Sequence, residues 1–168
     1  MGMIGNYRRI TIDQLAKLQE DRDSIWGFLF PDDGVEYSDE NYLNIDKAWH
    51  GIHFLLTGTM YEGEPPLVNV VMGGSPLDDP HNPQFDYGSV RFLMPEEVQE
   101  VAEALSQISE ADLQARFHPS ELSAANIYPN IWERGTEEFE YLMFYYLHLV
   151  KFFQDAAKLD KAMLLYIT

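Results

Sequence analysis

The spacing of apolar residues along the chain predicts helices alternating with short strands. The most regular pattern lies in residues 137–158, where apolar side chains recur every three or four positions. Further apolar residues, among them Phe144 and Tyr145, lie off this stripe. A helix that is apolar on most sides is usually buried on more than one side. The pattern therefore predicts one long, buried helix near the C-terminus.

The remaining elements are shorter. Thr11, followed three positions later by Gln14, is typical of a capping box that opens a helix, and Pro95 occupies a favourable first helical position. Strands are predicted for Met3–Ile10, Tyr87–Leu93 and Ala162–Ile167, whereas Leu67–Met72 fits either a buried strand or a helical turn. Because the order lacks regular βαβ spacing, we predict an α+β fold in which several helices cover a small mixed sheet.

The segment Asn44–Gly58 predicts a helix with an aspartate and two histidines along one side and a glycine in its interior. Asp46 and His50 are four residues apart and His50 and His53 three apart, so neighbouring members meet on one face of a helix. A glycine inside a helix costs about 1 kcal/mol relative to alanine. Gly51 therefore indicates that another backbone or a bound molecule lies against this helix.

Composition narrows the class of protein. The chain has 168 residues, of which 46% are hydrophobic, so a single globular domain spanning residues 1–168 is expected. The net charge of −17 disfavours nucleic acids and anionic membranes as partners and favours a cation or a basic protein. The chain has no cysteine, no apolar run of about 20 residues and no signal-peptide pattern, so a cytoplasmic protein is expected.

Several segments together resemble one bacterial family of unknown function, the YfbM-like family. The likeness covers nearly the whole chain, and its most specific part is Lys47-Ala48-Trp49-His50-Gly51-Ile52-His53. This family has no assigned activity, so the resemblance implies no catalytic residue. The other matching segments are Met3-Ile4-Gly5, Phe28-Leu29-Phe30-Pro31, Gly73-Gly74, Tyr87-Gly88 with Arg91, Pro95-Glu96-Glu97-Val98, and Ile127-Tyr128-Pro129 with Trp132.

Candidate chemistry gathers around the two histidines. Either one would serve as a general acid/base, as a metal ligand, or as a structural residue hydrogen-bonded to the backbone. Metal ligation from one helix normally uses positions i and i+4 plus a further ligand, and no such set is present, so we expect no bound metal and no cofactor. Arg91, in an apolar strand, would pair with a carboxylate or bind an anion.

The interpretation that fits these residues best is a non-enzymatic binding module. It would recognise a small molecule or a basic protein partner in a cleft with aromatic walls. The alternative is an enzyme that uses His50 or His53 as a general acid/base. The candidate cleft residues are Asp46, Trp49, His50, His53, Tyr87, Arg91, Tyr128 and Trp132.

Overall fold

Five strands form one sheet in the computed structural model, which describes residues 2–31, 40–79 and 87–168. The strand order is β2-β1-β5-β4-β3, and every neighbouring pair is antiparallel. The α+β class is therefore confirmed, but the sheet is antiparallel where the sequence predicted a mixed one. The strands are β1 (Gly5–Ile10), β2 (Tyr42–Asn44), β3 (Ser75–Pro76), β4 (Arg91–Leu93) and β5 (Ala162–Ile167).

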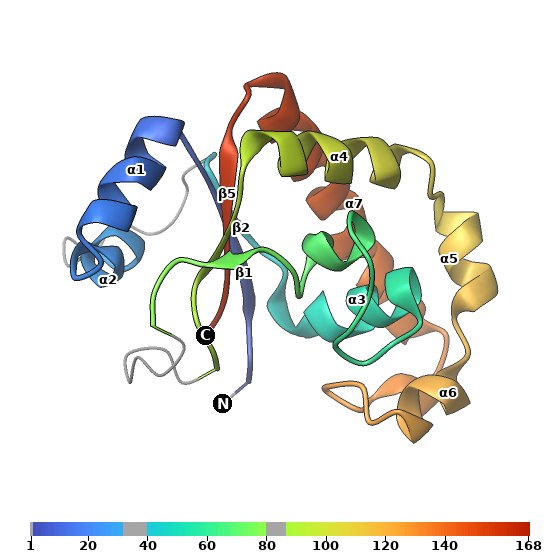
Figure 1. Cartoon of the computed structure of the whole chain (residues 1–168). Helices are drawn as coiled ribbons and strands as arrows, with labels where there is room; N and C mark the ends of the chain where they lie inside the picture. Colours follow the sequence, from blue (N-terminus) through green and yellow to red (C-terminus); the bar gives the residue numbers. More distant parts are fainter. Residues whose placement is uncertain (1, 32–39, 80–86) are drawn as a thin grey trace.

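Helices cover both faces of this sheet (Figure 1). On one side of the sheet lie α1 (Ile12–Glu20) and α2 (Ser24–Leu29), and on the other side lie the remaining helices, with α5 and α6 farthest from the strands. These are α3 (Trp49–Thr57), α4 (Pro95–Ser106), α5 (Glu110–Arg116), α6 (Pro119–Ala124) and α7 (Glu137–Lys158), with 3-10 turns η1 (Asp46–Ala48), η2 (Leu67–Val70) and η3 (Trp132–Arg134). Among the helices that the structure describes, none has the length and hydrophobicity needed to cross a bilayer.

The central strand β5 divides the core into two clusters. Side chains alternate between the two faces of a strand, so Leu164 and Tyr166 point to one cluster and Met163 and Leu165 to the other. The smaller cluster lies under α1 and α2, and the larger one joins the sheet to α3, α4 and α7. Because both faces of β5 are buried, its sequence is a continuous apolar run in which apolar and polar residues do not alternate.

Helix α7 has the predicted bounds, but it is buried along one side only. Leu142, Tyr146 and Leu149 are fully buried against the core. Phe144 and Leu147 face outward, with 57% and 50% of their surfaces exposed. The predicted long, buried C-terminal helix is therefore confirmed, but its burial does not extend to the face of Phe144 and Leu147, because α4, α3, η1 and η3 contact its other side.

The segment Asn44–Gly58 is not one helix, as the sequence predicted. Strand β2 ends at Asn44, and Asp46, the first residue of the 3-10 turn η1, adopts a left-handed backbone with φ 50°. The α-helix α3 begins only at Trp49 and ends at Thr57, and the φ of 76° at Gly58 fits its predicted role as a left-handed cap. Within the segment Leu67–Met72, residues Leu67–Val70 form the 3-10 turn η2, in agreement with the helical alternative.

Candidate functional site

His50 is a buried residue of α3 with both ring nitrogens hydrogen-bonded. Nδ1 accepts the backbone N–H of Tyr128 at 2.9 Å, and Nε2 lies 2.9 Å from the backbone oxygen of Met60. A carbonyl oxygen only accepts, so Nε2 carries the proton and the ring is neutral. Burial lowers the pKa of His50 below its ordinary value and favours this neutral form. His50 thus joins two loops to α3 and has no ring nitrogen left for proton transfer.

Four aromatic rings form a continuous stack around His50, in the order Tyr128, Trp49, His50 and Tyr61. The successive centroid distances are 5.7, 4.8 and 5.1 Å, and the interplanar angles are 25°, 11° and 18°. Both backbone groups of Met3 hold the stack, because its oxygen accepts the Trp49 indole N–H and its N–H donates to the Tyr128 hydroxyl, each at 2.9 Å. The rings are therefore fixed from α3, from two loops and from the N-terminal segment.

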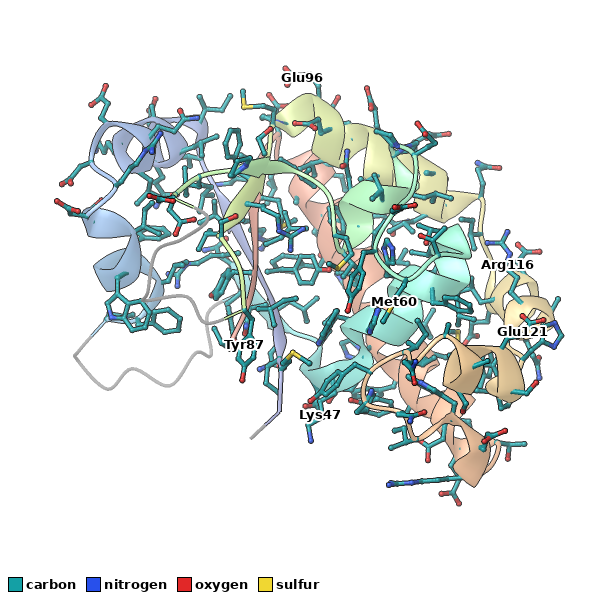
Figure 2. The ribbon with its side chains drawn as sticks, turned by 60° about the horizontal axis from the view of Figure 1, so that its bottom comes forward. Lys47, Met60, Tyr87, Glu96, Arg116 and Glu121 are labelled. Carbon is teal, nitrogen blue, oxygen red and sulfur yellow. The ribbon has the colours of Figure 1, made fainter. Side chains whose placement is uncertain are left out.

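This stack forms part of the wall of a pocket of about 450 Å³. Tyr61 and Tyr87 are 53% and 44% exposed. Met3 and Ile167 lie near the two chain ends, which are in the lower half of the molecule in Figure 1. Figure 2 brings the bottom of the molecule forward and labels Met60 and Tyr87. The lining residues are Met3, Trp49, His50, Tyr61, Met72, Tyr87, Asn126, Tyr128, Pro129, Asn130 and Ile167, and none of them carries a formal charge with His50 neutral.

His53 does not share this pocket. It is completely buried, and its Nε2 lies 3.3 Å from the hydroxyl of Thr57, whereas Nδ1 has no hydrogen-bond partner among the described residues. Burial, together with the nearby His50, lowers the pKa of His53 to about 4. His53 is therefore a neutral core residue at pH 7, one turn along the helix from the pocket.

Asp46 contacts α7 rather than His50. Its carboxylate accepts the Tyr141 hydroxyl at 3.0 Å, and that hydroxyl accepts the backbone N–H of Lys47 at 3.1 Å. Burial and the Asp46 carboxylate raise the pKa of Tyr141. Contrary to the prediction, Asp46 and His50 do not lie on one face of a helix, because Asp46 precedes α3.

Arg91 is hydrogen-bonded to backbone oxygens instead of a carboxylate. One guanidinium nitrogen donates to the oxygens of Val71 and Gly73, at 2.8 and 2.7 Å, and no carboxylate of the described residues forms an ion pair with it. It lines a void of about 10 Å³, which has room for about one water molecule and none for a larger anion. Arg91 thus fixes the chain after η2 against β4, and among the described residues its partners are backbone oxygens rather than a carboxylate.

Trp132 lies on another side of α3 and lines a separate cavity of about 740 Å³ with Phe117 and Phe139. It is fully buried, and its indole N–H donates to the backbone oxygen of Ile127 at 2.7 Å. Its ring packs directly on Gly51, where an added Cβ would lie 2.7 Å from Trp132 Cη2. The glycine therefore permits close packing between elements and does not form the floor of the pocket.

The structure brings four of the eight predicted residues to one pocket: Trp49, His50, Tyr87 and Tyr128. Sequence reasoning missed Tyr61, whose loop returns to α3 through the His50–Met60 hydrogen bond. It also missed Met3 and Ile167, which meet because β1 and β5 pair antiparallel. Met3 belongs to a segment of the family resemblance, but no local pattern places any of these three residues in a pocket. Among the described residues, no group of three His, Cys, Asp or Glu side chains is arranged to hold a metal ion.

Comparison with known proteins assigns the family. The chain is 27% identical over 134 residues to Protein YfbM of Escherichia coli strain K12, covering 78% of this chain and 75% of that protein. It matches the crystal structure of YfbM, a protein of unknown function from Escherichia coli, with a TM-score of 0.75 and 24% identity. That match covers 98% of this chain and 99% of the other and shows a common fold. Residues 1–166 match the model of a domain of unknown function, DUF1877, and the chain therefore belongs to the DUF1877 family, as the predicted YfbM-like resemblance implied.

Proposed function

We propose that this protein is a binding module that takes a small organic molecule in the pocket beside His50. The observation that carries the proposal is a concave, uncharged pocket with a fixed stack of four aromatic rings in its wall. Ligand sites in proteins typically combine apolar and aromatic walls with a few polar groups. Here Asn126 and Asn130 supply side-chain amides, and the tyrosines supply hydroxyls.

The lining and the net charge together define the class of ligand. A neutral, apolar lining favours a molecule with an aromatic or aliphatic ring, and the charge of −17 opposes anions and attracts cations. Aromatic faces also attract organic cations. We therefore expect an uncharged or positively charged ligand, and the same pocket would accept a lysine or arginine side chain of a basic protein partner.

The binding role is preferred over acid/base catalysis because of how the two histidines are held. His50 has both nitrogens engaged by the backbone, and His53 lies in the core away from the pocket. A catalytic base needs a nitrogen within hydrogen-bond reach of the substrate. His50 serves instead as a positioning residue, since it ties the loops of Tyr61 and Tyr128 to α3.

A pair of cavity-filling variants tests the proposal. Met72→Trp places an indole in the ring-lined pocket, whereas Ser120→Trp places one in the separate cavity beside Trp132. The compounds are benzyl alcohol, benzyltrimethylammonium and benzoate, which share a ring and differ in charge. We expect the first two to raise the melting temperature of the wild type and of Ser120→Trp, but not that of Met72→Trp. Equal shifts in both variants, no shift with any compound, or strongest binding of benzoate would contradict the proposal.

A further inference from the structure

The outer face of α7 carries an exposed apolar patch, defined by Phe144, Tyr145, Leu147 and His148. The Phe144 ring contacts Tyr145 at 5.0 Å and His148 at 4.6 Å between centroids. Phe144 and Leu147 expose half or more of their surfaces, although both are large and apolar. Contiguous exposed apolar side chains on a helix are typical of an interaction surface. In Figure 1, α7 lies behind α3 and α4, and it contacts α4 and α3 through its other side.

Charged residues flank the patch in a self-complementary order. Glu140 lies one turn before Phe144, and Lys151 lies one turn after Leu147, so the four positions share one helical face. Glu140 is exposed, and the Lys151 side chain is 76% exposed. When a second copy of this helix is reversed, Phe144 faces Leu147 of the other copy and Glu140 faces its Lys151. By two-fold symmetry each of these contacts forms twice.

We propose that this face of α7 binds the same face of a second copy of the chain, as an antiparallel helix pair. The order acid–apolar–apolar–base explains why a second copy fits: the two ends of the face attract one another only when the helices are reversed. Within one chain, Lys151 already contacts Asp155 at 2.6 Å, and the facing Glu140 adds a second carboxylate beside the same ammonium group.

The size of the face sets the strength of the pair. A helix of 22 residues is about 33 Å long, and its single exposed face is smaller than the roughly 800 Å² per partner of a standard interface. The charge of −17 on each copy also opposes association. We therefore expect a dissociation constant in about the micromolar range or weaker, with the fraction of dimer depending on concentration.

Sedimentation velocity with charge-reversed variants tests the pair. Wild type is measured at about 0.15 M salt, from about 5 to about 500 µM, where it should pass from monomer toward dimer. Glu140→Lys and Lys151→Glu should each raise the dissociation constant by about tenfold, because each variant opposes like charges across the pair. An equimolar mixture of the two variants should recover association, because the mixed pair aligns opposite charges at both ends.

Two apolar variants complete the experiment. Leu147→Glu should abolish dimerisation, whereas Leu159→Glu, at a residue 57% exposed beyond the end of α7, should leave it unchanged. Both positions are exposed, and melting temperatures of all variants confirm folding. The proposal is overturned if wild type stays monomeric at the highest concentration, if Leu147→Glu still dimerises, or if the mixture associates no better than its components.

Discussion

Replacing Gly51 by alanine tests how α3 packs in the core. An added Cβ would lie 2.7 Å from Trp132 Cη2 and 2.8 Å from Leu142 Cδ2, closer than real side chains approach. Both neighbours are completely buried, and the hydrogen bond from the indole to Ile127 restricts movement of the Trp132 ring. The methyl group must therefore displace these two side chains or the elements that carry them, η3 and α7.

The expected cost of Gly51→Ala follows from two opposing effects. Inserting a methyl group into a filled core typically costs about 1–3 kcal/mol, whereas replacing a helical glycine by alanine contributes up to about 1 kcal/mol. We expect a net loss of about 1–2 kcal/mol, since crowding outweighs helix propensity. For a chain of this length that corresponds to a fall in melting temperature of about 2–8 °C.

Gly27→Ala is the matched control. Gly27 lies within α2, and no atom comes within 4 Å of a Cβ added there, so the same change should stabilise the protein by up to about 1 kcal/mol. In a Leu142→Ala background, which removes part of the crowding, Gly51→Ala should cost less than in the wild type. Thermal and urea unfolding of the four variants measures these effects. A melting temperature that Gly51→Ala leaves unchanged or raises would refute the reasoning.

Three further predictions follow from burial and protonation. Leu149→Ala, at a fully buried site, should lower the free energy of unfolding in urea by about 2–5 kcal/mol. Leu147→Ala, on the exposed face, should change it by less than about 0.5 kcal/mol. Equal effects of the two variants would show that the faces of α7 are misassigned. His53 has a pKa lowered to about 4 in the folded state, so as pH falls the unfolded chain becomes protonated at this residue before the folded protein does. The free energy of unfolding therefore falls as pH drops from about 6.5 toward 4, by at most about 1.4 kcal/mol for each pH unit. His53→Gln should remove that part of the slope, which is measured as the difference between the unfolding free energies of wild type and variant; an identical slope would contradict a buried neutral histidine. Elemental analysis should find no stoichiometric transition metal, and one zinc, nickel or iron per chain that is lost in His50→Ala would contradict the predicted absence of a metal site.

Capping residues and apolar periodicity predicted the elements that depend on contacts between residues close together in the sequence. The hydroxyl of Thr11 accepts the Gln14 N–H at 3.1 Å and the Gln14 side chain accepts the Thr11 N–H at 2.9 Å, as the capping box implied. The bounds of α7 and β5 also agree with the apolar pattern. The exposure of Phe144 was not predictable, because periodicity identifies an apolar surface without showing whether another element covers it.

The site was predictable in part for the same reason. Trp49 and His50 are adjacent in a distinctive segment, so their common location follows from the sequence. The left-handed backbone of Asp46 removed it from the helix, and no residue type required that conformation. Tyr61 joins the stack only because His50 binds the Met60 carbonyl, a tertiary contact that no local pattern records.

The role of the His50 pocket is tested most directly by the indole N–H signals of the three tryptophans in a ¹H–¹⁵N NMR spectrum. Trp49 lines the pocket, Trp132 lines the other cavity, and Trp26 lies in α2 beyond the sheet. Titration with benzyltrimethylammonium should shift the Trp49 signal, assigned with Trp49→Phe, in a saturable manner and leave those of Trp26 and Trp132 in place. If no indole signal moves, or if all three move together, the pocket beside His50 is not the binding site.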